Sequence, residues 1–400
     1  MAKPLGPVCN LDCDYCFYLS KEKLLSTDTQ WRMSDEVLES FIRQYIEGQN
    51  YKEVVFSWQG GEPTLLGLDF LYRVVELQKK YAPSWMRIEN DLQTNGTLLD
   101  DDWCGFLAEN DFLVGLSIDG PGQLHDHYRT YKDGRGTFDD VFRASKLLRK
   151  HKTRFTTLSC VNHVTAKHPL EVYRFLRDEV GPERMQFIPI VEPRIFRETA
   201  PQKWPDFLVP DMDDPRARPG TPESVVEDWC VDPDDYGDFL IAIFDEWRIN
   251  DIGRHFVTFF ESAIAQWMGK ISPLCIFGPI CGKGVAIEHD GSVYSCDHYV
   301  YPEYRLGSIR DESIDHMVLS EKQEAFGYAK DMSLPGQCRR CDYLFACAGE
   351  CPKNRFIRTP EGERGLNYLC SGLKKYFRHI DPHVQKIIRD MGREPVEGVV

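Results

Sequence analysis

The sequence predicts an α/β protein: a partial (β/α)6 barrel of the TIM type, then a small cysteine-rich domain and a C-terminal helix. Three observations predict this. Strand-like apolar runs alternate with stretches of helical spacing as far as residue 192. A proline-rich acidic segment at 201–233 interrupts that alternation. Most of the fourteen cysteines then gather after residue 273. Repeated βα units of this kind build parallel sheets with right-handed connections.

The strand-like runs end in loops where functional residues are expected. The runs expected to form strands are 53–63, 88–96, 112–120, 154–162 and 184–192, the first of them ending in a Gly-Gly turn. The helical stretches between them are 68–82, 101–110, 138–151 and 169–181. About six such units suit a barrel or partial barrel, whose active site lies at the C-terminal ends of the strands. Only eight residues precede Cys9, so the first strand should be short or the chain start truncated.

The second half is expected to be organised differently. Helical spacing returns at 236–250 and 255–270, and again from 365 to 391, where Pro382 is expected to interrupt the helix. The expected parts are a barrel at 1–200, a linker or loop at 201–233, a helical connection at 234–272, a cysteine-rich domain at 273–372, and a C-terminal helix with a tail at 373–400.

Composition excludes several classes of protein. The net charge of −15 argues against a nucleic-acid surface, which needs clustered positive charge. No apolar run is long enough to span a membrane, and the first residues do not form a signal peptide. We therefore expect a cytoplasmic protein whose cysteines serve metal binding or catalysis rather than disulfides. Cys104 and Cys160 fit ordinary buried thiols, whereas Cys230 lies in a polar stretch and has no assignment.

The first cysteine group, Cys9, Cys13 and Cys16, has the spacing CxxxCxxC. Structural zinc usually takes four ligands, so a zinc site would need a fourth ligand from elsewhere in the chain. Three thiolates also suit a [4Fe–4S] cluster in which one iron has no protein ligand. Structural clusters are normally closed by four cysteines, so an open iron indicates catalysis.

This motif, with Tyr15 before its last cysteine, resembles the radical S-adenosylmethionine (SAM) superfamily. The resemblance implies that the open iron binds the methionyl amino and carboxylate groups of SAM. The loops GGEP (60–63), QTNGT (93–97) and SIDGP (117–121) follow strand-like runs and agree with it. By resemblance, the SAM-contacting residues are Tyr15 at the adenine, Gly60, Gly61 and Glu62 at the amino group, Ser117 and Arg129 at the ribose and carboxylate, and Val191 on a later strand.

The second cysteine group contains eight members: Cys275, Cys281, Cys296, Cys338, Cys341, Cys347, Cys351 and Cys370. The DG pair in EHDGSVYSC (288–296) predicts a short hairpin. Each CxxC alone would fit a zinc knuckle. The ordered set resembles the SPASM extension, which implies two auxiliary [4Fe–4S] clusters. By resemblance, one takes Cys275, Cys281, Cys296 and Cys351, and the other takes Cys338, Cys341, Cys347 and Cys370.

Asp297 directly follows Cys296 in CDHYVYPEYRLGSI, and this stretch resembles the anaerobic sulfatase-maturating enzymes. The match extends over nearly the whole chain, including KPLGPVCNLDCDYCFY and SWQGGEP. It implies that Asp297 is the general base and that Gln59 contacts the substrate backbone. A carboxylate can take a thiol or hydroxyl proton when it lies within hydrogen-bond reach. The alternative for Asp297 is a turn-capping residue.

The predicted function is therefore oxidation of a cysteine or serine in a sulfatase to Cα-formylglycine. Its expected cofactors are three [4Fe–4S] clusters and SAM, with a flavodoxin or ferredoxin as electron donor and no membrane or nucleic-acid partner. One alternative is a SPASM peptide maturase that forms a thioether or carbon–carbon crosslink in a precursor peptide. Another is a zinc or iron–sulfur scaffold without catalysis. Counting the bound iron distinguishes the enzyme from a zinc scaffold, since three [4Fe–4S] clusters hold about twelve irons per chain.

Overall fold

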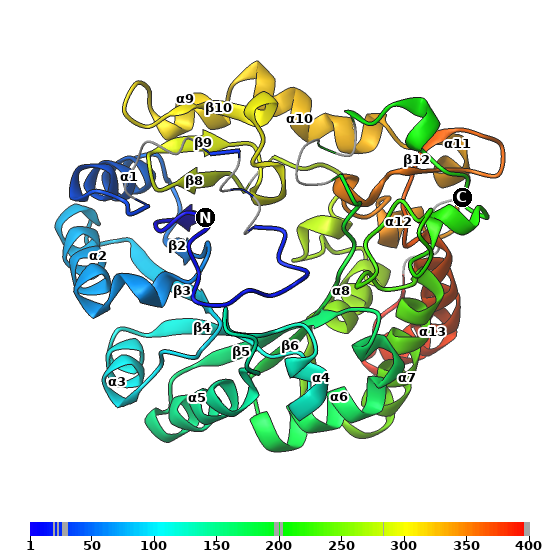
Figure 1. Cartoon of the computed structure of the whole chain (residues 1–400), viewed down its shortest axis with the longest axis horizontal. Helices are drawn as coiled ribbons and strands as arrows, with labels where there is room; N and C mark the ends of the chain where they lie inside the picture. The colour runs from blue at the N-terminus through cyan, green and yellow to red at the C-terminus, as the bar shows by residue number, and fades with distance from the viewer. Residues whose placement is uncertain are drawn as a thin grey trace. The chain divides into compact units, whose positions relative to one another are not determined.

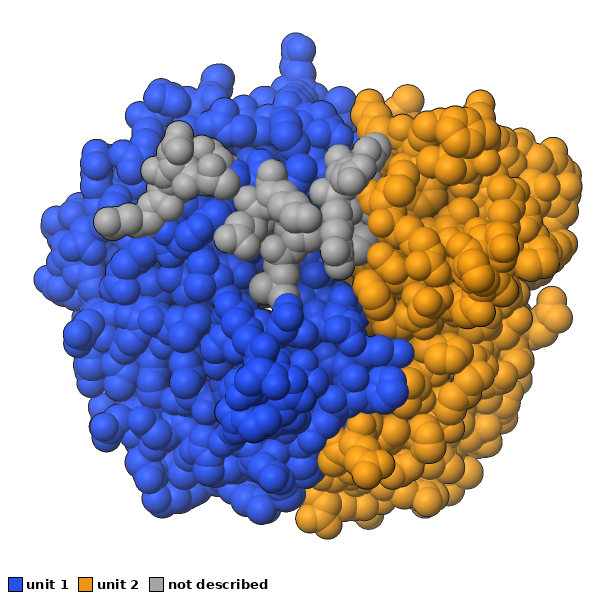
Figure 2. All heavy atoms as spheres, viewed as in Figure 1, with its two compact units in different colours: residues 1–118, 125–157, 282–327 blue, residues 119–124, 158–281, 328–400 orange. Residues whose placement is uncertain are grey.

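The structure is a computed structural model, and it describes residues 1–18, 21, 24–25, 31–195, 200, 203–282 and 284–395. The chain divides into two compact units, coloured separately in Figure 2. Unit 1 comprises Met1–Ile118, His125–Thr157 and Gly282–Gly327; unit 2 comprises Asp119–Leu124, Leu158–Cys281 and Tyr328–Val400. Parts of the expected linker (201–202) and tail (396–400) lie outside the described residues. No described helix has both the length and the apolar character needed to cross a bilayer.

Unit 1 contains a parallel sheet with helices along its outer side (Figure 1). Its strands pair in chain order: β1 (Ala2–Lys3), β2 (Glu53–Trp58), β3 (Arg87–Thr94) and β4 (Phe112–Ser117). The helices are α1 (Asp35–Glu47), α2 (Leu68–Tyr81), α3 (Asp101–Glu109), the short α4 (Gly122–Asp126), whose first residues belong to unit 2, and α5 (Phe138–His151). The predicted strands and helices of this region are confirmed, and the first strand is short.

Local sequence explains where these elements begin and end. In β2, alternate residues Val54, Phe56 and Trp58 are buried, as period-two patterning requires. Ser34 caps α1 by accepting a hydrogen bond from the Val37 amide at 3.3 Å. Asp100 caps α3 in the same way. Neither cap was predicted, and the helix at 35–47 was not among the expected helical stretches.

Three antiparallel strands continue the unit 1 sheet on the far side of β1. They are β8 (Ala286–Glu288), β9 (Ser292–Tyr294) and β10 (Arg305–Ser308). The predicted hairpin is confirmed, with Gly291 at φ 89° in its turn. The structure adds a pairing that the sequence did not indicate: β8 runs parallel to β1, with Ala2 opposite Ile287 and Lys3 opposite Glu288. This pairing places the segment after the hairpin, which carries Cys296 and Asp297, in the same unit as the first cysteine group.

Unit 2 contains the parallel pair β6 (Arg184–Pro189) and β7 (Phe256–Val257), and β5 (Phe155–Val161) crosses the division between the units. Its longer helices are α6 (Pro169–Phe175), which continues as a π-turn at Leu176–Val180, α7 (Pro233–Asn250), α8 (Thr258–Trp267) and α13 (Cys370–Asp390). The segment at residues 203–232 contains short 3-10 turns at Asp206–Leu208 and Pro215–Ala217 and isolated β-bridges at Asp211 and Val226. Its irregular character was predicted.

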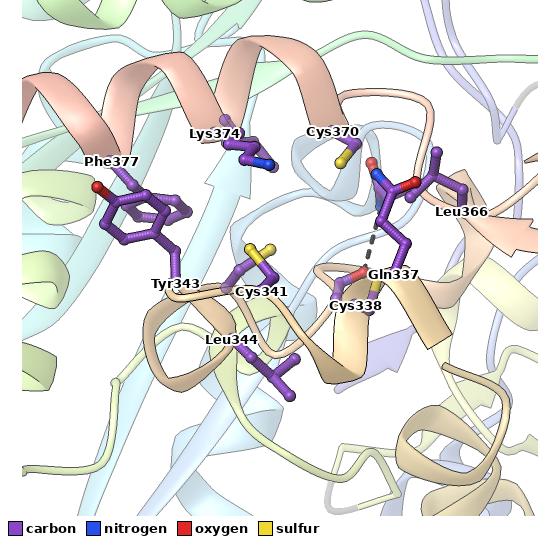
Figure 3. A pocket seen from close by; sticks show the side chains of 13 residues that line it. Gln337, Cys338, Cys341, Tyr343, Leu344, Leu366, Cys370, Lys374 and Phe377 are labelled. Carbon is purple, nitrogen blue, oxygen red and sulfur yellow. Dashed lines mark hydrogen bonds between the residues drawn. The ribbon is translucent and has the colours of Figure 1, made fainter. Parts of the chain in front are cut away.

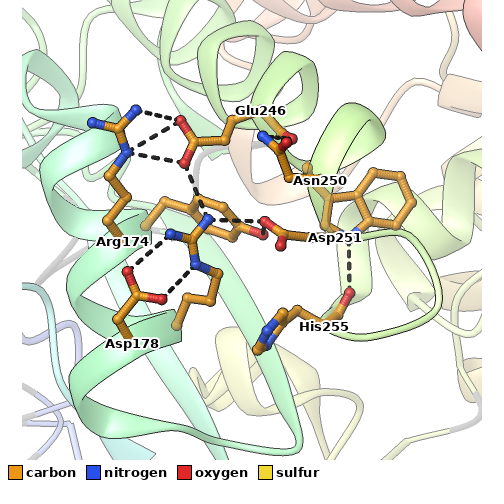
Figure 4. Close-up of polar contacts among 9 residues, drawn as sticks. Arg174, Asp178, Glu246, Asn250, Asp251 and His255 are labelled. Carbon is orange, nitrogen blue, oxygen red and sulfur yellow. Dashed lines mark hydrogen bonds and ion pairs between the residues drawn. The ribbon is translucent and has the colours of Figure 1, made fainter.

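A cluster of charges joins α6 and its π-turn to α7 (Figure 4). Glu246 accepts hydrogen bonds from Arg174 Nε at 2.9 Å and from Arg177 Nη1 at 3.1 Å. Asp251 accepts from Arg177 Nη1 at 3.0 Å and from the Tyr173 hydroxyl at 2.7 Å. Every charged group in this cluster has an opposite partner, so we assign the cluster a structural role.

The expectation that Pro382 interrupts the last helix is wrong. Helix α13 runs without a break through Pro382, although it begins at Cys370 rather than at 365. Proline removes one backbone donor from a helix, but packing can hold the helix together. Phe377, Ile380 and Val384 are buried on either side of it. Tertiary packing therefore overrides the local cost of the proline.

Two glycines let α7 and α13 approach closely. A Cβ on Gly372 would lie 1.7 Å from the carbonyl oxygen of Pro233, and a Cβ on Gly237 would lie 2.7 Å from that of Gly372. We predict that Gly372→Ala destabilises the protein by about 1–3 kcal/mol, because backbone must move to admit the methyl group. Thermal unfolding followed by circular dichroism measures this.

Gly105→Ala in α3 is the matched control, since the nearest atom to its added Cβ is 4.0 Å away. It should be neutral or stabilising, because alanine favours helix over glycine by about 0.5–1 kcal/mol. Equal melting temperatures for Gly372→Ala and the wild type would show that the two helices are not held by this contact.

Candidate active site

The first cysteine group lies in a loop fixed by the segment 128–131. The amide of Asp12 donates to the carbonyl of Thr130 at 2.9 Å, and the amide of Asp14 donates to that of Tyr128 at 3.3 Å. Within the loop, the Cys16 amide donates to the Cys13 carbonyl at 3.0 Å. The three cysteines are half-buried, so their thiols face a partly enclosed space. Three half-buried cysteine thiols in one short loop fit a thiolate-ligated metal centre.

The Gly-Gly turn after β2 holds the other side of this loop. The amide of Gly61 donates to the Gly6 carbonyl at 2.8 Å, and the amide of Glu62 donates to the Val8 carbonyl at 2.9 Å. A Cβ on Gly61 would lie only 1.9 Å from the Val8 oxygen. Glycine is required here because backbone meets backbone, directly before Cys9.

Glu62 joins the turn to the end of β3. Its buried carboxylate accepts hydrogen bonds from the Thr64 hydroxyl at 2.6 Å, the Thr94 hydroxyl at 2.8 Å and the Asn95 amide at 2.7 Å. Burial raises the pKa of Glu62, and these hydrogen bonds oppose that rise. These hydrogen bonds show that Glu62 connects the Gly-Gly turn to the end of β3. Its predicted contact with the SAM amino group stays a prediction.

Two asparagines were missed by the sequence analysis. Asn95 Nδ2 lies 3.8 Å from Cys9 Sγ and donates to Asn10 Oδ1 at 2.9 Å. Asn10 Nδ2 in turn donates to the Thr97 hydroxyl at 2.9 Å. Donors directed at a thiolate orient the ligand and stabilise its charge. The signal for Asn95 was the polar run QTNGT at the end of a strand, and the signal for Asn10 was its place between Cys9 and Cys13.

The structure brings Tyr15 and Arg129 together. The Arg129 guanidinium lies 5.5 Å from the Tyr15 ring centroid, and Tyr128 packs edge-on against the same ring. Arg129 is 8% exposed, so it is not a solvated loop charge. Ser117 Oγ accepts a hydrogen bond from Gln93 Nε2 at 2.8 Å. Arg129 and Ser117 thus belong to unit 1 with the cysteine loop.

Val191 belongs to unit 2, where it is buried. Its carbonyl oxygen accepts a hydrogen bond from Lys353 Nζ at 2.8 Å. The same ammonium pairs with Glu192 Oε1 at 2.5 Å. The predicted contact of Val191 with SAM stays a prediction.

Asp297 begins a short turn after Cys296 and is half-buried. Its Oδ1 accepts a hydrogen bond from Cys296 Sγ at 3.5 Å. The next residue, His298, packs against Phe17 with the ring centroids 4.9 Å apart and the ring planes tilted by 41°. Burial raises the pKa of Asp297, but the charges of His298 and Lys3 outweigh it, and the pKa falls to about 2. The carboxylate is therefore ionised at neutral pH.

Lys3, Tyr18 and Glu288 form a buried group on the β1 and β8 side of unit 1. The Tyr18 hydroxyl donates to Glu288 Oε1. Lys3 Nζ lies 3.7 Å from the Tyr18 ring centroid. Gln59 follows β2, and its amide donates to the Ala2 carbonyl at 2.9 Å. The residues predicted to act on substrate thus lie in the unit that carries the first cysteine loop.

Four cysteines of the second group line one pocket in unit 2 (Figure 3). They are Cys338, Cys341, Cys347 and Cys370. Leu344, Leu366, Leu373 and Phe377 supply much of the remaining wall. Burial, followed by the charges of Cys338 and Cys341, raises the pKa of Cys370 to about 12. Four thiols facing one apolar pocket fit a closed, thiolate-ligated cluster.

Three more cysteines of the second group lie in unit 2, and the eighth, Cys296, lies in unit 1. Cys281 and Cys351 interact electrostatically with each other, and both interact with Glu350. Burial raises the pKa of the Cys281 thiol, while the charges of Lys330 and Arg355 lower it.

The lone cysteines serve packing. Cys104 is buried, as predicted, and burial raises its pKa to about 12. Cys160 is half-buried, so the expectation of a fully buried thiol is wrong; its position on β5 exposes one side. Cys230, which had no assignment, is buried and exchanges hydrogen bonds with the Glu192 backbone at 3.1 and 3.3 Å.

Two family models match the chain. Residues 4–176 match the radical SAM superfamily, and residues 275–342 match the SPASM iron–sulfur cluster-binding domain. With the three-cysteine loop held at the ends of parallel strands, these matches define a class. The chain is a radical SAM enzyme, an oxidoreductase with iron–sulfur clusters and SAM as cofactors, and it carries a SPASM domain.

Similar proteins specify the family within that class. A serine-type anaerobic sulfatase-maturating enzyme of Bacteroides thetaiotaomicron is 44% identical over 391 residues, covering 98% of this chain and 91% of its own. A cysteine-type enzyme of Clostridium perfringens is 32% identical over 393 residues, covering 98% of both. A solved structure of anSMEcpe with bound AdoMet and Cp18Cys peptide is 32% identical, covers 98% of both chains and has a TM-score of 0.81. The chain belongs to the anaerobic sulfatase-maturating enzymes.

Glu288 should make stability depend on pH. Burial raises its pKa to about 7, against the opposing effects of Lys3 and the Tyr18 hydroxyl. Because the folded protein holds this proton more tightly than the unfolded chain, stability should fall as pH rises from about 4.5 to 7. The loss is on the order of 3 kcal/mol. Glu288→Gln should remove this pH dependence, so the stability of the variant relative to the wild type should increase as the pH rises.

Melting temperatures from pH 5 to 8 measure the effect. Exposed Glu303→Gln is the control and should follow the wild type at every pH. Parallel curves for Glu288→Gln and the wild type would show that the buried carboxyl titrates normally.

Proposed function

We propose that this enzyme oxidises Cβ of a cysteine or serine in a sulfatase to give Cα-formylglycine. The observation that carries the proposal is the site in unit 1. It combines a three-cysteine loop, the Arg129–Tyr15 pair and an ionised carboxylate at Asp297 beside Lys3. The identity of 44% over almost the whole chain to a serine-type relative supports the same activity.

We assign the cofactor ligands as follows. Cys9, Cys13 and Cys16 hold a [4Fe–4S] cluster with one iron open to SAM. Two closed clusters complete a set of three, one held by Cys275, Cys281, Cys296 and Cys351, the other by Cys338, Cys341, Cys347 and Cys370. Tyr15, Gly60, Gly61, Glu62, Ser117, Arg129 and Val191 contact SAM.

The open cluster and SAM, when bound, supply the 5′-deoxyadenosyl radical that removes one hydrogen atom from the substrate Cβ. Asp297 accepts the proton of the substrate thiol or hydroxyl. A carboxylate of low pKa is a weak base, so the transfer is driven by the loss of an electron from the substrate radical. Lys3 holds the carboxylate ionised until then. The closed cluster of Cys275, Cys281, Cys296 and Cys351 would accept that electron. Loss of one hydrogen atom, one proton and one electron converts serine to the aldehyde. The same losses convert cysteine to a thioaldehyde, which water then hydrolyses to the aldehyde.

Substrate and electron partners follow from the same proposal. Gln59, whose backbone extends the pairing of β1 and β2, contacts the substrate backbone. A short flexible sulfatase segment is the substrate. A flavodoxin or ferredoxin supplies the electron that initiates SAM cleavage.

Matched sulfatase peptides test the function. The anaerobically loaded enzyme, with SAM and a reductant, should convert the Cys or the Ser peptide to the aldehyde, detected by mass spectrometry and hydrazine labelling. A crosslinked peptide would assign the chain to the peptide maturases instead. If the enzyme cleaves SAM in the presence of both peptides but converts neither peptide to a product, the proposal is refuted.

Asp297→Asn tests the base. Removing the carboxylate should lower aldehyde formation at least about a hundredfold, the usual contribution of a general base, while SAM cleavage persists. Asp311→Asn, an exposed site in the same unit, is the control and should keep both activities. Normal aldehyde formation by Asp297→Asn would show that another group takes the proton.

A further inference from the structure

Two buried cations lie beside cysteines of the second group in unit 2. Lys330, near the end of α10 (Glu321–Met332), is 1% exposed. Its Nζ donates to the carbonyl oxygen of Cys275 at 3.0 Å and of Ile276 at 2.7 Å. The ammonium therefore binds the segment that begins this cysteine group.

Arg355 is the second cation and is 6% exposed. Its guanidinium donates to backbone carbonyls of Gly349 at 2.8 Å, Ala348 at 3.0 Å and Glu350 at 3.2 Å. These three residues all have left-handed backbone, with φ of 70°, 46° and 52°. The strained turn joins Cys347 to Cys351, and Arg355 holds it in place. A fourth bond, to the Lys330 carbonyl at 2.5 Å, links the two cations.

Neither cation forms an ion pair with a carboxylate among the described residues. Burying a charge is costly unless an opposite charge compensates it. The neighbouring Lys353 has such a partner, since it pairs with Glu192 at 2.5 Å. The nearby carboxylate of Glu350 acts on Lys330 through its charge, but it accepts its hydrogen bonds from Asn354 at 3.0 Å and Asn367 at 2.6 Å. One buried carboxylate balances only one of the two cations, so a further negative charge is favoured beside them.

The cysteines beside them meet that need. Burial lowers the pKa of Lys330, and the negative charges of Cys281, Cys351 and Glu350 act against this effect. Arg355 interacts with Cys281 and also with Cys338 of the other thiol set. A cluster held by four thiolates is a net anion, and reduction adds one more negative charge. A buried cation favours the reduced form strongly because the surroundings screen it poorly.

We propose that Lys330 and Arg355 raise the reduction potential of the closed cluster whose ligands in unit 2 are Cys275, Cys281 and Cys351. This inference rests on the proposed function, in which that cluster takes the electron lost by the substrate radical. The residues touch neither substrate nor SAM in this role. They act through the cluster, because their positive charges raise its reduction potential.

Potentiometric titration followed by electron paramagnetic resonance tests the inference. The parent for this test is the full chain with Cys9→Ala, Cys13→Ala and Cys16→Ala. It is loaded anaerobically with iron and sulfide, so only the clusters of the second cysteine group can form. The relevant redox wave is the one lost in a further Cys281→Ala variant. Lys330→Met should lower the reduced-to-oxidised ratio at fixed potential about tenfold, or about 59 mV for a one-electron couple. Lys330→Arg keeps the charge and should restore the potential.

The controls separate charge from packing. If Lys330→Met fails to load this cluster, Lys330→Gln provides the same neutral comparison. Loss of the cluster in both neutral variants, with retention in Lys330→Arg, also supports compensation by charge. An unchanged potential in a loaded neutral variant, or loss of the cluster in all three variants, overturns the inference. Absence of any second-group cluster in the parent chain would instead refute the ligand assignment, so the two failures are distinguishable.

Discussion

The close approach of the Gly61 backbone to the Val8 carbonyl is the constraint on which the site depends. It leaves no room for a Cβ and fixes the chain one residue before Cys9. Glu62 extends this hold to the end of β3 through Asn95, which in turn reaches Cys9. Hydrogen bonds to the 128–131 segment secure the loop from the other side. The three cysteines are thus set by backbone contacts at the ends of parallel strands, where a bound cofactor is reached most easily.

Features that depend on local sequence could be predicted. The strands and helices of the first half follow from apolar periodicity, and the β8–β9 hairpin follows from its Asp-Gly turn. The three-cysteine spacing fitted an open [4Fe–4S] cluster and also a zinc site with a fourth ligand from elsewhere, and the resemblance favoured the first and supplied the family. Helix α13 shows the limit of such local rules, because buried neighbours carry the helix through Pro382.

Features that depend on distant pairing could not be predicted. Nothing in residues 1–8 or 286–288 indicates that β1 and β8 lie side by side, with Lys3 opposite Glu288. That pairing gives Tyr18 its buried carboxylate partner and gives Asp297 the charge of Lys3. The same holds for Lys330, whose importance comes from the carbonyls and thiols around it rather than from its helix. Charge compensation in a core is a property of three-dimensional neighbours.

The proposed activity requires that one iron of the cluster assigned to Cys9, Cys13 and Cys16 has no protein ligand. Electron–nuclear double resonance measures this on the reduced enzyme with SAM labelled at its methionyl nitrogen and carboxylate oxygens. We expect hyperfine coupling to both labels, lost when Cys13 is changed to alanine. A cluster that shows no coupling because the polypeptide ligates every iron, or zinc bound at Cys9, Cys13 and Cys16, would contradict the proposed chemistry.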